Sequence, residues 1–384
     1  MNQLNICIVL GTRPEIIKMA PVIRACQKHG ISFFLVHTGQ HYSYNMDEVF
    51  LEELGLPPAK YQLEVGSGTH GQQTAGILPA LEQILFEERP DVILVQGDTN
   101  TVLAGALASA KSTTRIGHVE AGLRSYDRTM PEEINRVLTD HVSHFLFAPT
   151  DISRQNLLRE GIVQENIFVT GNTIVESIQN HVQMAQKKSS VLKRLKLKPQ
   201  HYFLLTAHRA ENVDYKQQLK GILEGLHRIT RFYETPLVWP IHPRTKKNIQ
   251  TFNLEKMFYA IPHLRIVDPL GFWDFLQLLS NSKLVLTDSG GMQEETCILK
   301  IPCVTLRQNT ERPETLDVGS NILAGTDPER MFEAVQEMLS REKIWTQPFG
   351  DGTTGDQIVE ILKRFSVNAE KVEGIHLETN SVKI

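Results

Sequence analysis

One stretch of the chain indicates the fold most clearly, and it reads Leu286-Thr287-Asp288-Ser289-Gly290-Gly291-Met292-Gln293-Glu294, followed by Glu295. It joins an apolar, strand-like run to a helix-like segment through a Gly-Gly turn. Such a turn lets the backbone approach an anion, and the positive end of the next helix attracts it. Carboxylates one turn inside that helix could bind ribose hydroxyls. The stretch also fits a plain helix start with Ser289 as N-cap, so a phosphate site and a structural cap both stay open.

Length and composition set the broad class of the protein. A chain of 384 residues exceeds the usual single domain, and 41% hydrophobic with 22% charged residues is ordinary for a globular protein. The net charge is −4 and basic residues form only local patches such as Lys246-Lys247, so we expect no nucleic-acid partner. No disulfide framework is expected, because C-x-x-C spacing is absent among Cys7, Cys26, Cys297 and Cys303. Without a signal-peptide pattern or a membrane-length apolar run, we expect a cytoplasmic protein with no membrane partner.

Short apolar runs alternate with amphipathic helix patterns along almost the whole chain, which predicts βαβ units and parallel sheets. We expect strands near 5–10, 33–37, 91–96, 115–119, 144–148 and 167–170, then near 202–207, 236–241, 264–267, 284–287, 303–306 and 320–323. The fold class is therefore α/β, with two facing, doubly wound domains and an active-site cleft between them. The predicted parts are a first domain at 1–187, a linker and hinge at 188–200, a second domain at 201–353, and at 354–384 a helix packing back on the first domain plus a polar tail.

The turns after the first-half strands carry the candidate groups. Arg13 and Lys18 follow the first strand and could reach a diphosphate, or could be solvated charges at a helix start. This turn lacks both G-x-G-x-x-G and G-K-[ST], so neither an NAD site nor an ATPase site is supported. Asp98 and Glu120 follow neighbouring strands, and two carboxylates brought together can act as acid and base. The structural alternatives are an N-cap for Asp98 and an ion pair with Arg124 for Glu120.

A helix is predicted from Pro131 onward. Its apolar residues Ile134, Val137, Leu138 and Val142 form the expected core face, so Glu132 and Arg136 fall on the opposite face and Glu132 is expected to point toward the cleft. The structural alternative is that Glu132 complements the helix dipole and pairs with Arg136.

In the second half, His208 and Arg209 follow one strand and His242 follows the next, as groups suited to a diphosphate. Arg312 could neutralise a phosphate or pair with Glu295. A metal site is not predicted, because the spacings of His118 with Glu120 and of His141 with His144 lack a third ligand.

Taken together, these segments resemble the non-hydrolysing UDP-N-acetylglucosamine 2-epimerases, a family with the GT-B fold of two Rossmann-like domains. The shared motifs are G-T-R-P-E-I-I-K at 11–18, H-T-G-Q-H at 37–41, Q-G-D-T-N at 96–100, H-V-E-A-G-L-R at 118–124, P-E-E-I-N-R at 131–136, H-R-A-E-N at 208–212, T-D-S-G-G-M-Q-E-E at 287–295 and T-E-R-P-E at 310–314.

The resemblance implies reversible C2 epimerisation of UDP-GlcNAc to UDP-ManNAc through UDP and an enzyme-held 2-acetamidoglucal, feeding cell-surface polysaccharide synthesis. It implies a cytoplasmic homodimer with UDP-GlcNAc, UDP-ManNAc and UDP as ligands and with neither cofactor nor metal. The catalytic residues it implies are Asp98, Glu120, Glu132 and His208. The residues it implies for binding UDP or substrate are Arg13, Lys18, Ser289, Gly290, Gly291, Glu295 and Arg312.

One departure concerns regulation. Members activated by UDP-GlcNAc carry a Gln-Arg-Gln element where this chain has Thr69-His70-Gly71-Gln72-Gln73, without the arginine. The candidate residues for a second, allosteric UDP-GlcNAc are Gln40, Arg209 and His242. The alternatives to the epimerase are an epimerase of a related UDP-diacetamido-uronic acid, a GT-B glycosyltransferase using UDP-GlcNAc, and a sensor that binds the nucleotide sugar without chemistry.

Overall fold

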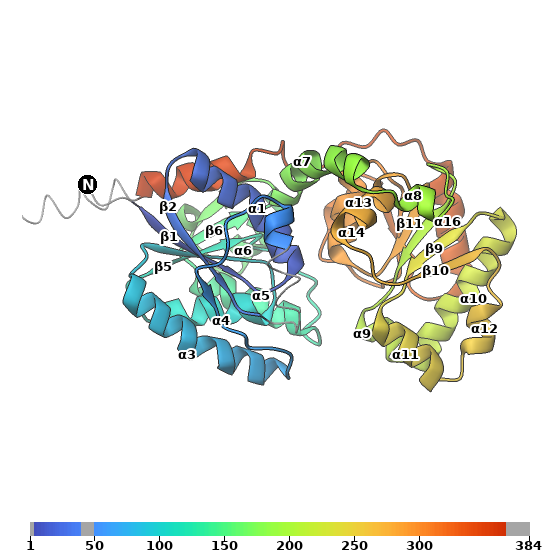
Figure 1. The fold of residues 1–384 in the computed structure, drawn as a ribbon, viewed down its shortest axis with the longest axis horizontal. Coiled ribbons are helices and arrows are strands. Elements are labelled where there is room, and N and C mark those ends of the chain that lie inside the picture. The colour runs from blue at the N-terminus through green and yellow to red at the C-terminus, as the bar shows by residue number, and fades with distance from the viewer. Residues whose placement is uncertain (1–3, 40–49, 366–384) are drawn as a thin grey trace, which may run out of the picture. The chain divides into compact units, whose positions relative to one another are not determined.

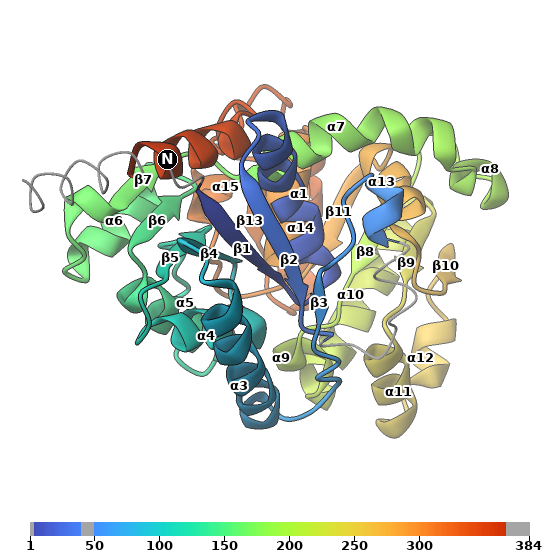
Figure 2. The same cartoon turned by 60° about the vertical axis from the view of Figure 1, so that its left-hand side comes forward.

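The computed structural model describes residues 4–39 and 50–365, and the chain divides into two compact units. One unit runs to Ser177 and takes up the chain again from Gly350, and the other is Ile178–Phe349. Each unit is a parallel sheet with helices on both faces (Figures 1 and 2). The predicted α/β class with two doubly wound sheets is confirmed.

The first unit has a seven-stranded sheet of order β3-β2-β1-β4-β5-β6-β7. Helices α3, α4 and α5 lie on one face of this sheet, and α1 with the helix of residues 354–365 lies on the other (Figures 1 and 2). Its elements are β1 (Asn5–Leu10), α1 (Arg13–Lys28), β2 (Ser32–His37), β3 (Tyr61–Gln62), α3 (His70–Glu88), β4 (Val92–Gln96), α4 (Asn100–Ser109), β5 (Arg115–Val119), α5 (Pro131–Val142), β6 (Phe145–Ala148), α6 (Asp151–Arg159), η1 (Gln164–Asn166) and β7 (Ile167–Val169).

Helix α7 (Thr173–Lys188) contains the boundary between the units, and the second unit has a six-stranded sheet of order β10-β9-β8-β11-β12-β13. Its elements are α8 (Val191–Arg194), β8 (Phe203–Thr206), α9 (Ala210–Val213), α10 (Lys216–Tyr233), β9 (Leu237–Pro240), α11 (Pro243–Thr251), α12 (Glu255–Tyr259), β10 (Leu264–Val267), α13 (Phe272–Ser280), β11 (Leu284–Thr287), α14 (Gly290–Ile298), β12 (Cys303–Thr305), α15 (Pro313–Asp317), β13 (Asn321–Leu323) and α16 (Pro328–Ser340).

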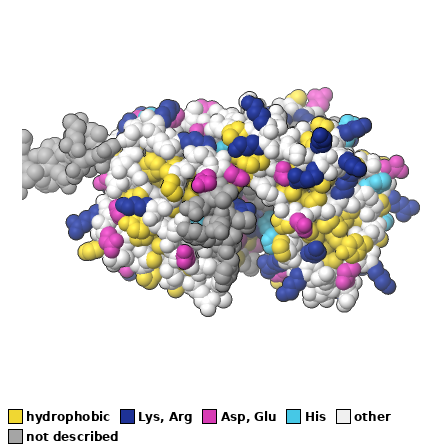
Figure 3. Space-filling view, viewed as in Figure 1, with side chains coloured by type: hydrophobic (Ala, Val, Ile, Leu, Met, Phe, Trp, Pro, Cys, Tyr) yellow, Lys and Arg dark blue, Asp and Glu magenta, His cyan; other side chains and the backbone are white. Residues whose placement is uncertain are grey.

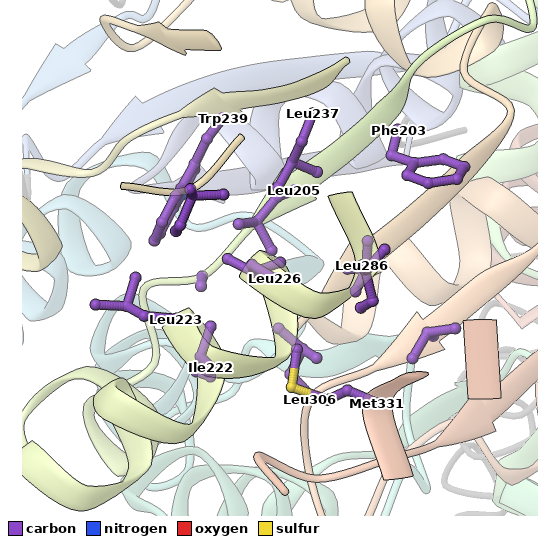
Figure 4. Packing of buried hydrophobic residues seen from close by; sticks show 14 of the residues in the cluster. Phe203, Leu205, Ile222, Leu223, Leu226, Leu237, Trp239, Leu286, Leu306 and Met331 are labelled. Carbon is purple, nitrogen blue, oxygen red and sulfur yellow. The ribbon is translucent and has the colours of Figure 1, made fainter. Parts of the chain in front are cut away.

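The two-residue period of the strands explains why both faces of the second sheet are covered. Phe203 and Leu205 of β8 point into a cluster with α10 and α16, whereas Leu204 between them points into a second cluster with α8, α13 and α14. In Figure 4, Leu205 and Leu286 from the strands face Leu226 of α10. Because apolar residues occupy both faces, the strands are continuous apolar runs rather than alternating ones.

The strand order of each sheet reverses at one point, between β1 and β4 in the first unit and between β8 and β11 in the second. All pairings are parallel, so the strands of one sheet end at the same edge. In open parallel sheets, ligands bind beyond the carboxyl ends of the strands at the point of reversal. The turns at these two points begin at Gly11 and Gly97 in the first unit and at Ala207 and Asp288 in the second.

The predicted linker at 188–200 lies inside the second unit. Val191 of α8 and Leu197 are buried in its core, beside Tyr202. Polar residues dominate the composition of this segment, which is why it was predicted to be a linker. Its few apolar side chains nevertheless anchor the segment in the core of the second unit. The chain passes between the units within α7 instead.

Helix α5 is oriented differently from the prediction. Its buried residues are polar or charged, namely Glu133, Asn135, Arg136, Thr139 and Asp140. Leu138, assigned to the core face by periodicity, is 45% exposed. The apolar stripe therefore does not mark the inner face of this helix, because hydrogen bonds and ion pairs to neighbouring turns hold the polar face inward.

Charged side chains of both signs share the surface. On the face shown in Figure 3, Lys and Arg lie among Asp, Glu and apolar side chains rather than forming one continuous patch. Within residues 4–39 and 50–365, every helix is too short or too polar to cross a membrane.

Candidate active site

A buried carboxylate lies at the switch point of the first sheet. Glu15, in the first turn of α1, accepts hydrogen bonds from the backbone N–H groups of Gly11 and Thr12 and from the hydroxyl of Thr99, at the start of α4. These bonds tie the turn after β1 to the turn after β4. Burial raises the pKa of Glu15 to about 7, although its hydrogen bonds oppose the shift. Glu15 belongs to the motif G-T-R-P-E-I-I-K at 11–18. Its position also suits an ordinary helix cap, so its role in joining these two turns was not predicted from the sequence.

Asp98 follows Gly97 in the turn after β4 and is held by an arginine from α5. Arg136 donates two N–H groups to the same Asp98 oxygen, at 3.0 and 2.6 Å. Arg136 also binds Glu133 at 2.6 Å, and Glu133 accepts the backbone N–H groups of Ser125 and Tyr126. The buried guanidinium thus keeps the Asp98 carboxylate in one orientation.

Glu120, after β5, pairs with the predicted diphosphate ligand Lys18. The Lys18 Nζ atom lies 2.8 and 2.7 Å from the two Glu120 oxygens, and the Gln96 amide also donates to this carboxylate. The alternative prediction, an ion pair between Glu120 and Arg124, is wrong. Arg124 instead binds Asp140 at 2.7 Å and Glu160 at 2.6 Å. Asp98 and Glu120 therefore lie in the turns after two neighbouring strands of one sheet.

The other two predicted residues of the first unit are less deeply placed. Glu132 is half-buried in the first turn of α5, next to the buried Glu133. Arg13, at the start of α1, lies with its guanidinium carbon 5.9 Å from the centre of the Phe50 ring. Both side chains start at the edge of the sheet where the strands end.

Asp288 holds the switch point of the second sheet together. One of its oxygens accepts the backbone N–H groups of His208 and Arg209, both at 2.8 Å, and the other lies 3.2 Å from His208 Nδ1. Burial alone raises the pKa of the Asp288 carboxyl, but the bonds and charge of His208 and the backbone N–H groups lower it below its usual value. With Nδ1 facing a carboxylate, His208 presents Nε2 elsewhere, and its side chain is 43% exposed.

The Gly-Gly turn has two glycines with different surroundings. A Cβ atom on Gly290 would lie 2.2 Å from Glu311 Oε1, whereas one on Gly291 would meet only Ser289 Oγ at 4.0 Å. Ser289 is the N-cap residue of α14, yet its hydroxyl makes no capping bond among the described residues. Gly290 is thus required by the packing of Glu311, while Gly291 leaves open space at the helix end.

The two glutamates of α14 differ in role. Glu294 is fully buried and forms an ion pair with Arg312. Glu295 is half-buried, so of the two carboxylates it is the one accessible to a ligand. Arg312 pairs with Glu294, the residue before its predicted alternative partner Glu295, because position 294 lies on the inner face of the helix.

Two residues predicted for an allosteric site lie close to this cluster. The ring centres of His242 and His208 are 5.9 Å apart, and Arg209 lies 3.8 Å from Glu311. His242 Nδ1 accepts the backbone N–H of Arg244 as the N-cap of α11, and burial, with the charges of His208 and Arg244, lowers the pKa of His242. The third, Gln40, lies outside the described residues.

The histidines considered as metal ligands have structural partners. His118 binds Asp140 and the Gly97 carbonyl, and His144 Nδ1 accepts the backbone N–H of Ile116. In the part of the chain that the structure describes, three or more His, Cys, Asp or Glu side chains nowhere converge as a metal site would need.

Two Rossmann-like units with polar groups gathered at their switch points define a nucleotide-binding protein of the GT-B fold. Residues 24–363 match the family described as UDP-N-acetylglucosamine 2-epimerase. The UDP-N-acetylglucosamine 2-epimerase of Methanocaldococcus jannaschii is 54% identical over 361 residues, which cover 94% of this chain and 99% of the relative. The chain therefore belongs to the UDP-N-acetylglucosamine 2-epimerase family, a family of isomerases.

Two further comparisons bear on substrate choice. The crystal structure of the Methanocaldococcus jannaschii UDP-GlcNAc 2-epimerase in complex with UDP-GlcNAc and UDP matches with a TM-score of 0.89 and 54% identity, covering 94% of this chain and 100% of that chain. The UDP-2,3-diacetamido-2,3-dideoxy-D-glucuronate 2-epimerase of Pseudomonas aeruginosa is 38% identical, covering 94% of this chain and 100% of the relative. The higher identity lies with the enzyme of the simpler sugar.

The raised pKa of Glu15 predicts a pH dependence of stability. A carboxyl that is harder to ionise in the folded state contributes stability below its usual pKa of about 4.5, and this contribution is lost as the pH rises through about 7. In Glu15→Gln the amide oxygen can accept from Gly11 and Thr12 while the amide nitrogen donates to Thr99. We expect the stability of the natural protein to fall relative to Glu15→Gln over this range, by up to about 1.4 kcal/mol per pH unit.

The measurement is thermal unfolding of both proteins from pH of about 5 to about 8. Parallel pH profiles for the two proteins would show that Glu15 does not titrate in this range.

The two glycines predict effects of different size for substitution by alanine. Gly290→Ala should lower the free energy of unfolding by about 1–3 kcal/mol, because the methyl group overlaps the buried Glu311 carboxylate. Gly291→Ala should change it by no more than about 0.5 kcal/mol. Urea unfolding of both variants measures this, with Gly291→Ala as the matched control. Equal stability of the two variants would contradict the packing role of Glu311.

Proposed function

We propose that this protein is a non-hydrolysing UDP-N-acetylglucosamine 2-epimerase, which interconverts UDP-GlcNAc and UDP-ManNAc without a cofactor or metal. Its membership of the family and its 54% identity to the Methanocaldococcus jannaschii enzyme support this proposal. The UDP-ManNAc formed would supply cell-surface polysaccharide synthesis.

The reaction proceeds by elimination and re-addition. A base removes the C2 proton, the electrons of the C–H bond form a C1=C2 double bond, and the C1–O bond breaks with its electrons passing to UDP. UDP and 2-acetamidoglucal result. UDP then adds back to C1 while an acid protonates C2 from the opposite face. A C2 proton of such low acidity requires preorganised groups for proton transfer and charge stabilisation.

The observation that carries the proposal is the gathering of carboxylates in the first unit. Asp98 and Glu120 follow adjacent parallel strands, each bound by a buried cation, Arg136 and Lys18 respectively. A site that only binds an anionic diphosphate does not need several carboxylates. A site that removes a proton from one face of a sugar and delivers one to the other face does need them. We assign the proton transfers to Asp98, Glu120 and Glu132.

We assign UDP binding mainly to the second unit. The open space at Gly291, the uncommitted hydroxyl of Ser289 and the start of α14 suit a phosphate. Glu295 suits the ribose, and Arg312 adds positive charge near the same helix. His208, oriented by Asp288, would donate a proton or hydrogen bond to the departing diphosphate. In the first unit, Arg13 and Lys18 would complete the binding of the substrate.

The decisive experiment is incubation of the purified protein with UDP-GlcNAc alone, followed by NMR of the anomeric signals. We expect UDP-ManNAc to appear in the absence of an acceptor, metal or nicotinamide. Turnover only with an added acceptor would identify a glycosyltransferase, and release of free ManNAc with UDP would identify a hydrolysing epimerase. Turnover of a UDP-diacetamido-uronic acid but not of UDP-GlcNAc, or binding without any turnover, would also overturn the proposal.

The same assay tests the assigned carboxylates. Asp98→Asn and Glu132→Gln should lose epimerisation while keeping the affinity for UDP, because UDP contacts lie mainly in the other unit. Asp151→Asn, which changes a 79% exposed side chain at the start of α6, serves as the control and should keep full turnover. Near-normal turnover of Asp98→Asn or Glu132→Gln would contradict the assignment of proton transfer to that residue.

We further propose a homodimer that forms through the α3-α4-α5 face of the first unit. Phe86 of α3, Leu107 of α4 and Leu138 of α5 are 70%, 37% and 45% exposed. The three helices are neighbours, with α4 in the middle (Figures 1 and 2). We take these exposed apolar side chains on adjacent helices as the candidate contact surface for the second copy.

The oligomer prediction is tested by light scattering after gel filtration. The natural protein should have twice the 43.5 kDa mass of one chain, and Leu138→Glu should have the mass of one chain. Ile344→Glu changes an 81% exposed side chain of the second unit, outside α3, α4 and α5, and should stay dimeric. A monomeric natural protein, or a dimeric Leu138→Glu, would refute this interface.

A further inference from the structure

A fully buried histidine joins the turns that carry the two carboxylates. His118, on β5, has Nε2 2.8 Å from the carbonyl oxygen of Gly97 and Nδ1 2.6 Å from Asp140 Oδ1. A carbonyl oxygen can only accept, so Nε2 carries a hydrogen. Both His118 and Asp140 have no exposed surface. Their bond is therefore shielded from competing water.

Asp140 is the centre of this network. Its second oxygen accepts the backbone N–H of Gly122 at 3.1 Å and lies 2.7 Å from Arg124 Nη1. These donors and the charge of Arg124 stabilise the ionised form of the Asp140 carboxylate, whose other oxygen pairs with His118 Nδ1. Burial alone raises the pKa of the Asp140 carboxyl, but His118 and Arg124 lower it below its usual value.

The network holds a strained turn. Glu120 has a φ angle of +73°, a left-handed conformation that costs a non-glycine residue of the order of 1–3 kcal/mol. Such a conformation persists only where its surroundings determine it. Here the Phe147 carbonyl accepts the N–H groups of Glu120 and Ala121, and Asp140 accepts that of Gly122. Asp140 thus fixes the far side of the Glu120 turn.

The same network reaches Asp98. His118 holds the Gly97 carbonyl, one residue before Asp98, and the Gly97 N–H donates to the carbonyl of Val119, one residue before Glu120. A continuous, buried path therefore runs from the Asp98 turn through His118 and Asp140 to the Glu120 turn. None of its inner members is among the groups assigned to proton transfer.

We propose that Asp140, acting directly on the Glu120 turn and through His118 on the Asp98 turn, is the positioning residue that sets the distance between the two acid/base carboxylates. This inference rests on the proposed epimerase activity. A group displaced by about 1 Å in such a reaction can cost about a hundredfold in rate, so a rigid link has a direct kinetic consequence.

The test uses three substitutions in the full-length protein. Asp140→Asn removes the charge and leaves a single acceptor oxygen, which cannot serve both the Gly122 N–H and a hydrogen on His118 Nδ1. His118→Gln places an amide nitrogen near the position of Nε2, so it can still hold the Gly97 carbonyl but leaves Asp140. His118→Asn places its amide near Nδ1, so it can still bind Asp140 but leaves Gly97. The Asp140→Asn, His118→Gln double variant completes a cycle that measures the coupling between them.

We expect Asp140→Asn to lower kcat by about a hundredfold, with each His118 variant showing a smaller loss. KM and the Kd for UDP from calorimetry should stay within about threefold, because UDP is bound mainly by the other unit. The double variant should be no slower than Asp140→Asn, because both changes break one path. Glu160→Gln removes a carboxylate from the outer end of the same charge network, where among the described residues it binds Arg124, and should keep kcat within about twofold.

The outcomes separate this proposal from the activity itself. A natural protein without epimerase activity overturns the proposed function. An active natural protein whose folded Asp140→Asn variant keeps normal kcat overturns the positioning role. If Asp140→Asn fails to fold, the two His118 variants test the positioning role in its place. A normal kcat in both of them overturns the proposal. A loss of UDP affinity equal to the loss of kcat would identify a general structural defect and would also overturn it.

Discussion

A buried carboxylate that binds backbone N–H groups holds the switch point of each sheet. Glu15 ties the turn after β1 to that after β4, and Asp288 ties the turn after β8 to that after β11. Parallel strands bring these turns to one edge, but the reversal of strand order leaves a gap between the helices there. A buried polar group there needs hydrogen-bond partners, so each carboxylate holds its two turns in one arrangement. The candidate site residues are placed by these constraints.

The two units use their switch points for different chemistry. In the first unit the carboxylates Asp98 and Glu120 are each bound by a cation from another element, which suits groups that must keep a fixed position. In the second unit a histidine and backbone N–H groups are presented, which suits an anion. His118 and Asp140 add a rigid connection behind the first set. Under the proposed function, binding and proton transfer can be altered by separate substitutions.

Particular residues show how far the sequence could predict this arrangement. Strand-forming runs and their order were predictable because both faces of each sheet are apolar. Asp98, Glu120, His208 and Ser289 were selected as candidates because they follow those runs. The inner face of α5 was predicted wrongly, since periodicity assumes an apolar core and this helix buries Glu133 and Arg136. The segment 188–200 was predicted as a linker from its polarity, although Val191 anchors it. In both cases a few specific contacts outweighed the average composition.

By itself, the sequence determined the α/β class, the alternation of elements and the family, because these follow from hydrophobic period and from residues adjacent in the chain. Only the tertiary structure decided which charges meet. Lys18 with Glu120, Arg136 with Asp98 and His118 with Asp140 are 22 to 102 residues apart. The same is true of Gly290, whose missing side chain makes room for Glu311. Such pairings depend on distances of a few ångströms between separate elements, and no local pattern in the chain encodes them.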